Sequence, residues 1–499
     1  MAGIGFTLKK MFQKETFSNR ALAYLYSSFI AAGPWIISVI SINALLMIMQ
    51  ILDVIAVERN LFSATIVYTF LFSQLLISPI QLLITRYLSD QLYEKKYNMV
   101  RPTFIGINKI VFFLSLIICT IFYWNKPIPI YYKIFSSYLF IVLSTIWILM
   151  IFLSAIKNYK LIIKAYLFGA LVTIGLLFYL IENPIYFNEY QSATNFLIAY
   201  LLGLTTTLVF FLYSFFSTFE HGSIYEFDFI RYFNKHFSLC LIGIFYTAGL
   251  WIDNLIIWFS KFELTILDTF RFAPYYDNAI FLSYLTIIPA LVLFLVLIET
   301  DFYLTYKQYF ANANSPVTLK EIKKSENKMK KTLSDNLFFT FFTQLLISVT
   351  IVLLSTQIFN FLNINYVIRD IFKITTIGTL FNILSFLLIL IFLYFERKEN
   401  ALFVAFSFFI LNGIFTLICK FLPIEYTGLG FTLASFISFM IASYILKKIL
   451  NEITYTTFAL QPIYIAEEKG VFVSLSKFLN AYLYKKDMQK QNYKEAVKK

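Results

Sequence analysis

The stretch AAGPWIIS at residues 31–38 lies inside the first long apolar run of the chain, and a similar stretch, TAGLWIDN, occupies residues 247–254. Both contain Ala-Gly-x-Trp-Ile, which places Trp35 and Trp251 in two separate apolar runs. Runs of about 20 apolar residues are long enough to cross a bilayer as helices. The repeated stretch therefore predicts a membrane protein with two similar halves.

The composition of the whole chain indicates a membrane protein. Of its 499 residues, 59% are hydrophobic and only 14% are charged, whereas soluble domains carry about 25% charged residues. Apolar runs predict an all-α polytopic membrane protein with twelve transmembrane helices. They lie near residues 22–50, 61–85, 103–124, 134–156, 161–181, 193–217, 237–259, 278–298, 337–358, 366–394, 401–419 and 428–446.

Two prolines extend the repeat into the second helix of each half. Pro79 in ISPIQLL and Pro289 in IIPALVL are each followed by an acidic stretch that contains tyrosine. Each proline should kink its helix unless neighbouring groups satisfy the carbonyl that it leaves free. Because six is an even number, both halves insert in the same direction, which predicts two parallel six-helix repeats, a common transporter architecture.

The distribution of positive charge predicts the topology. Most of the 41 Lys and Arg residues lie in loops that face the cytoplasm if the N-terminus does, so both termini are expected to be cytoplasmic. An inner face that contacts anionic membrane lipids accounts for the net charge of +13 without a nucleic acid partner. The expected segments are a cytoplasmic interfacial helix (1–21), the first six-helix lobe (22–217), a cytoplasmic linker (218–236), the second six-helix lobe (237–446) with a charged cytoplasmic loop (303–335), and a cytoplasmic tail (447–499). The loop and the tail either dock a partner or are simply solvated.

Several longer motifs resemble a known family. These motifs are MAGIGF, GPW, GLWIDN, YYDNAIFLSYLTIIPA and IETDFYLTYKQYF. They are similar to motifs of the PelG family, the inner-membrane exporters of Pel exopolysaccharide. The resemblance implies a MATE- or flippase-like fold of two six-helix lobes, as in the multidrug/oligosaccharidyl-lipid/polysaccharide exporter (MOP) superfamily. It also implies a cationic polysaccharide substrate, secreted across the bacterial inner (cytoplasmic) membrane during biofilm formation. The implied partners are a cytoplasmic Pel glycosyltransferase and the membrane subunits of a cyclic-di-GMP-regulated complex.

Asp253 is the first candidate residue of the substrate path. It lies about 10 Å below the outer surface at 1.5 Å per residue, and an acid at such depth tends to face a lobe interior or a wet cavity. Since the family resemblance implies a cationic polymer, the carboxylate would offer it a counter-charge. The alternatives are a structural ion pair with Arg369 or Lys373, and a site for proton or sodium coupling. The adjacent Asn254 lies on the same path or only hydrogen-bonds a neighbouring helix.

Aromatic residues are further candidates, because sugar rings stack on aromatic faces. Trp35, Trp251, Tyr276 and Tyr284 either line such a path or belong to the packing surfaces and interfacial belts of a membrane protein.

Charged residues near the predicted helix ends complete the candidates. Arg86 extends to the lipid headgroups or contacts an entering sugar or phosphate, and Arg369, Asp370 and Lys373 are expected to form a local ion-pair network. Glu299 and Asp301 either receive a cationic glycan or anchor a partner.

The sequence offers little material for catalysis. Its three cysteines lie in different apolar runs, and its two histidines both lie in the predicted linker. We therefore expect no enzyme activity, no metal and no cofactor. The favoured function is export of a nascent amino-sugar exopolysaccharide. The alternatives are a flippase for lipid-linked oligosaccharide or a small-cation antiporter on the same fold, and a non-transporting membrane scaffold for the glycosyltransferase.

Overall fold

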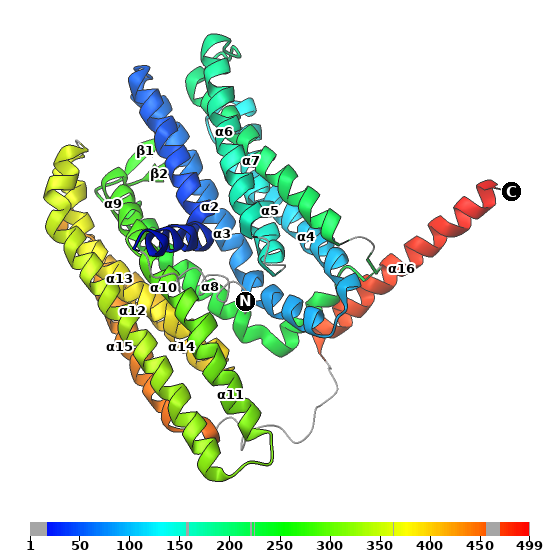
Figure 1. The fold of residues 1–499 in the computed structure, drawn as a ribbon. Coiled ribbons are helices and arrows are strands. Elements are labelled where there is room, and N and C mark those ends of the chain that lie inside the picture. Colours follow the sequence, from blue (N-terminus) through cyan, green and yellow to red (C-terminus); the bar gives the residue numbers. More distant parts are fainter. Residues whose placement is uncertain are drawn as a thin grey trace. The chain divides into compact units, whose positions relative to one another are not determined.

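The computed structural model describes residues 17–155, 159–219, 222–223, 225–362, 364–455 and 470–498. These residues form long helices and one two-stranded hairpin (Figure 1). The elements in chain order are α2 (Phe17–Ile51), α3 (Ala56–Tyr93), η1 (Tyr97–Met99), α4 (Val100–Tyr123), α5 (Ile130–Ala155), α6 (Tyr159–Glu182), α7 (Gln191–Thr218), η2 (Asp228–Arg231), α8 (Tyr232–Ile257), β1 (Leu264–Ile266), β2 (Phe270–Phe272), α9 (Pro274–Leu285), α10 (Ile288–Leu297), η3 (Ile298–Phe302), α11 (Tyr303–Ala313), α12 (Leu319–Phe361), α13 (Tyr366–Tyr394), α14 (Lys398–Cys419), η4 (Ile424–Tyr426), α15 (Leu429–Asn451) and α16 (Val471–Lys498).

The apolar runs of the sequence become membrane-length helices. Twelve helical segments of the described chain are long and apolar enough to cross a membrane, and each corresponds to one predicted segment. Helices are favoured there because an apolar solvent offers no partners to backbone N–H and C=O groups, and a helix pairs them internally. The prediction of an all-α polytopic membrane protein with twelve transmembrane helices is confirmed, while the two-repeat arrangement and the cytoplasmic termini stay predictions.

Two predicted segments have different boundaries in the structure. Residues 1–16 of the expected interfacial helix lie outside the described residues, and its last residues belong to α2, which runs without interruption to Ile51. The charged loop 303–335 consists of α11 and the beginning of α12. At 43 residues, α12 is about 65 Å long, about twice the thickness of the hydrocarbon layer. Its charged first part therefore continues into a transmembrane helix.

The chain forms two compact units. The first unit comprises the described residues up to Ile36, then Gly249–Leu264, and then the described chain from Phe272 to the segment before α16. The second unit comprises Ile37–Ala248, Thr265–Arg271 and α16. The chain thus changes unit at Ile36 and at Ala248, and both positions lie inside a copy of the repeated Ala-Gly-x-Trp-Ile stretch. The predicted lobes, 22–217 and 237–446, stay a prediction.

The segment between the seventh and eighth transmembrane helices is folded. It contains the β1–β2 hairpin, whose residues Thr265–Arg271 pack within the second unit. The hydroxyl of Tyr68 donates to the Arg271 carbonyl at 2.8 Å and accepts from the Arg271 N–H at 3.0 Å. The buried ring of Phe270 packs against Tyr68 at 5.0 Å between centroids. Residues of α3 therefore anchor the hairpin.

Pro79 lies inside α3 without ending it. Proline has no N–H with which to bond the carbonyl four residues before it, that of Leu75. The hydroxyl of the preceding residue, Ser78, donates to this carbonyl at 2.9 Å. A neighbouring polar group thus satisfies the freed carbonyl, as the sequence required for an unbroken helix.

The helix of the eighth transmembrane segment is interrupted just before Pro289, because α9 ends at Leu285 and α10 begins at Ile288. The break leaves backbone groups without helical partners. The buried amide of Gln344 on α12 bridges it, because its Nε2 donates to the Thr286 carbonyl at 2.8 Å and its Oε1 accepts from the Ala290 N–H at 3.2 Å. One side chain from α12 therefore satisfies both sides of the discontinuity.

We predict that Gln344→Leu lowers the free energy of unfolding by about 2 kcal/mol, because it leaves a buried carbonyl and a buried N–H unpaired. Thermal denaturation of the purified protein in one detergent measures the effect. Gln357→Leu makes the same change at an exposed position of the same helix and is the control. Equal melting temperatures for the two variants would contradict this role.

Candidate functional site

Two buried carboxylates lie where α8 ends and α9 begins, in the first unit. Asp253 is 0% exposed and Asp277 is 9% exposed. Asn254 lies in the last turn of α8, and Trp258 directly follows the end of that helix. The Trp258 N–H donates to the Asn254 carbonyl at 2.9 Å, so the two side chains, four positions apart, share one face. We call Asp253, Asn254, Trp258, Tyr276 and Asp277 the buried acid network.

Asp277 holds the two helices together. Its carboxylate accepts hydrogen bonds from Asn254 Nδ2 at 2.7 Å, from Trp258 Nε1 at 2.9 Å and 3.0 Å, and from the Ala273 N–H at 3.0 Å. It also lies in the first turn of α9, where the helix dipole favours negative charge. These donors come from the end of α8 and the start of α9, so we assign Asp277 a structural role.

Asp253 has a different environment. The hydroxyl of Tyr276 donates to its Oδ2 at 2.6 Å, while Oδ1 accepts no hydrogen bond of standard geometry from the described residues. The ion pair considered with Arg369 or Lys373 is wrong, because both cations pair with Asp370, at 2.9 Å and 3.3 Å. The local ion-pair network predicted for those three residues is confirmed. A buried acid without an ion pair is costly in a membrane and is typical of a functional position.

The repeated stretch brings α14 against α8 one turn before Asp253. A Cβ on Gly249 would lie 2.7 Å from the ring of Phe408, so the glycine permits this close approach. The amide of Asn412 donates to the Gly249 carbonyl at 2.8 Å and accepts from the Thr416 hydroxyl at 3.1 Å. Close packing of α14 on α8 therefore accompanies the complete burial of Asp253.

Three of the four predicted aromatic residues lie on α9 or pack against it. Trp35 makes an edge contact with Phe281 of α9, with ring centroids 6.4 Å apart. Tyr284 of α9 packs against Phe431 of α15 at 6.0 Å. Trp251 is half-buried on α8. These contacts are packing contacts within the first unit, and a role for the rings in sugar binding stays a prediction.

The predicted charged residues lie on other elements than those that form this network. Arg86 belongs to the second unit, and its Nε lies 3.3 Å from Asp90 Oδ1. Glu299 and Asp301 lie on η3, a π-helical segment, and the side chain of Glu299 is outside the described residues. A π-helical turn inside an α-helix is often found at functional sites.

Sequence reasoning missed Asp277 and Trp258. Asp277 belongs to the YYDNAIF motif, but it lies before the predicted start of the eighth transmembrane helix and so passed for a loop residue. The sequence feature that could have identified it is an acidic residue next to the candidate Tyr276 and four residues after Ala273, in the first turn of a helix. Trp258 could have been identified by its spacing, because it follows Asn254 by four positions and side chains at this spacing are neighbours on a helix.

A family model named PelG, with the description "Putative exopolysaccharide Exporter (EPS-E)", matches residues 1–458. The chain belongs to the PelG family. No curated protein sequence matches it. The match to the PelG family covers both units of the fold but ends before α16, which begins at Val471.

Solved structures with a similar fold are transporters of the MOP superfamily. The MATE transporter ClbM, in complex with Rb⁺, is 15% identical, with a TM-score of 0.54 and coverage of 86% of this chain and 96% of ClbM. A MOP superfamily transporter from Pyrococcus furiosus is 11% identical, with a TM-score of 0.54 and coverage of 87% and 96%. A variant of the Vibrio cholerae MATE transporter VcmN is 10% identical, with a TM-score of 0.58 and coverage of 90% and 98%. At these identities the likeness shows the fold of this PelG-family chain.

We predict that Trp258→Phe destabilises the first unit by about 1–3 kcal/mol, because it removes the indole donor from the buried Asp277 carboxylate. The melting temperature of the purified protein measures the loss. Trp124→Phe is the matched control, since Trp124 is 75% exposed. If both variants have the melting temperature of the unmodified protein, the Trp258 indole does not stabilise the Asp277 carboxylate.

Proposed function

We propose that this protein exports a nascent amino-sugar exopolysaccharide across the bacterial inner membrane. Membership of the PelG family, by a match over residues 1–458, carries this proposal. The MATE/MOP-like fold with twelve membrane-length helices supports transport over an enzymatic function. The substrate is a Pel-like polymer, secreted in synthase-dependent biofilm formation. A cytoplasmic glycosyltransferase makes the polymer, within a membrane complex regulated by cyclic-di-GMP.

Within this function, we assign Asp253 a direct role in the transport cycle. The Tyr276 hydroxyl donates to its Oδ2 at 2.6 Å, and the carboxylate makes no ion pair among the described residues. Its complete burial means that a polymer reaches the carboxylate only in another conformation. As a counter-charge, it would be uncovered when the path opens and would meet the amino groups of the substrate.

Burial also supports a second role for Asp253, the coupling of export to a proton or an alkali cation. A proton or a bare cation needs far less space than a sugar. One MATE transporter of similar fold, ClbM, was solved in complex with Rb⁺. A small-cation antiporter and a flippase for lipid-linked oligosaccharide are the alternative transport functions, and a membrane scaffold is the alternative without transport.

We predict that Asp253→Asn lowers polymer export at least about tenfold, equivalent to about 1.4 kcal/mol, because it removes the charge and keeps the side-chain volume. Inverted membrane vesicles that contain this protein, the glycosyltransferase and labelled nucleotide sugar measure export as polymer protected from an added glycosidase. Tyr276→Phe should give a smaller loss, because it keeps the carboxylate and removes its hydrogen bond.

The control is Asp53→Asn, an exposed position with φ of 50°, a left-handed conformation that asparagine adopts readily. It should export as the unmodified protein does. Collapse of the proton and sodium gradients separates the two roles of Asp253. If the residue couples export to a cation, unmodified protein then falls to the level of Asp253→Asn. If it is a counter-charge, unmodified protein still exports more than the variant.

Polymer that is made normally but digested equally with and without this protein would contradict export. That result would favour the scaffold.

A further inference from the structure

The tail of this chain docks on its own linker. The predicted tail, 447–499, contains α16, whose first part packs against the segment before α8 in the second unit. Asn480 Oδ1 accepts from the Phe227 N–H at 3.0 Å, and the Ser476 hydroxyl donates to the Phe227 carbonyl at 2.9 Å. Ser476 and Asn480 are 4% and 6% exposed. Two side chains one helical turn apart thus satisfy both backbone groups of a single linker residue.

A cavity of about 580 Å³ lies between α16 and this linker. Small-molecule sites in proteins usually have volumes of about 300–1,000 Å³. The cavity belongs wholly to the second unit, whereas Asp253 belongs to the first. Its lining residues are Tyr225, Asp228, Arg231, Val473, Ser476, Lys477, Asn480, Ala481 and Tyr484.

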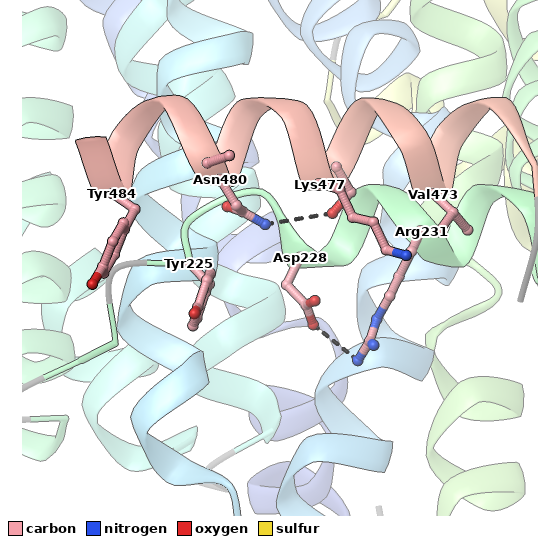
Figure 2. A pocket seen from close by; sticks show the side chains of 9 residues that line it. Tyr225, Asp228, Arg231, Val473, Lys477, Asn480 and Tyr484 are labelled. Carbon is pink, nitrogen blue, oxygen red and sulfur yellow. Dashed lines mark hydrogen bonds and ion pairs between the residues drawn. The ribbon is translucent and has the colours of Figure 1, made fainter. Parts of the chain in front are cut away.

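The two ends of the cavity differ in chemistry. Figure 2 shows Arg231 and Lys477 at one end and the rings of Tyr225 and Tyr484 at the other, with Asp228 between them. The rings come from both walls, Tyr225 from the linker and Tyr484 from α16. One end therefore suits an anion, and the other suits a flat or cyclic group.

The electrostatic balance of the cavity favours an anion. Asp228 is the one acidic residue among those that line it. Its Oδ2 lies 3.0 Å from Arg231 Nη2 and accepts a hydrogen bond from the Tyr87 hydroxyl at 3.1 Å. Because Arg231 compensates this carboxylate, Lys477 leaves the cavity with a net positive charge. Arg231 keeps further N–H groups, since a guanidinium has five.

We propose that this cavity binds a phosphate ester that carries a ring. Lys477 and Arg231 would hold the phosphate, as charge-assisted donors do, and Tyr225 and Tyr484 would flank the ring. A soluble nucleoside diphosphate and a ring-bearing lipid headgroup such as phosphoinositol share this chemistry. Since the ligand would contact α16 and the linker together, its binding would also stabilise the docked tail.

The test uses the full-length protein in nanodiscs of phosphatidylcholine, with uridine diphosphate and adenosine diphosphate as soluble probes. Isothermal titration calorimetry measures their affinity, and uridine without phosphate is the negative probe. Native mass spectrometry of protein from nanodiscs doped with phosphatidylinositol counts the retained lipid. Both measurements are repeated for Lys477→Gln, and for Lys447→Gln as the matched control at an exposed position of α15.

Binding of the diphosphates that weakens at least tenfold in Lys477→Gln, and not in Lys447→Gln, supports a soluble nucleotide ligand. Phosphatidylinositol retained by the unmodified protein and lost in Lys477→Gln, without nucleotide binding, supports a lipid headgroup. The proposal is overturned if neither probe binds, or if Lys477→Gln and Lys447→Gln have equal effects.

A second variant removes the space and keeps the charge. Ala481→Phe places a ring in the cavity from α16, so we expect it to abolish binding while Lys477 and Arg231 remain. Limited proteolysis of α16 shows whether the tail of each variant is still docked, and bound ligand should slow that cleavage in the unmodified protein. Ligand binding that persists in Ala481→Phe would place the ligand outside this cavity and overturn the proposal.

Discussion

Backbone polar groups inside a bilayer must find partners within the protein, and the structure of this chain depends on that constraint. Two prolines challenge it. At Pro79 the hydroxyl of Ser78 bonds the carbonyl that the proline leaves free, and α3 continues. Near Pro289 the helix breaks, and the Gln344 amide from α12 pairs with both sides of the break. The same problem thus has a local solution at Pro79 and a tertiary solution near Pro289.

The broken helix positions the buried acid network. Because the eighth transmembrane segment is divided, its first part, α9, is a separate short helix whose first turn meets the end of α8. Asp277 joins the two helices through donors from both of them. This leaves the second carboxylate, Asp253, buried with Tyr276 as its hydrogen-bond donor. One acid holds the site together, and the other is the residue for which we propose a role in transport.

The repeated Ala-Gly-x-Trp-Ile stretch also has a structural meaning. Both copies lie where the chain changes compact unit, at Ile36 and at Ala248. In the second copy, Gly249 permits a close contact with the Phe408 ring, and Asn412 bonds the glycine carbonyl. The difference between the copies, Asp253 and Asn254 in place of Ile37 and Ser38, provides two members of the buried acid network.

The sequence by itself determined the membrane class, the twelve helices and the family, because apolar length and long ordered motifs are local properties of the chain. It also identified Asp253, Asn254 and Tyr276, since polar residues inside or beside an apolar run are visible without a structure. Only the tertiary structure decided that Arg369 and Lys373 pair with Asp370, that Asp277 and Trp258 complete the site, and that α16 docks on Phe227. Each of these depends on which distant residues meet, and the periodicity of one helix carries no information about its neighbours.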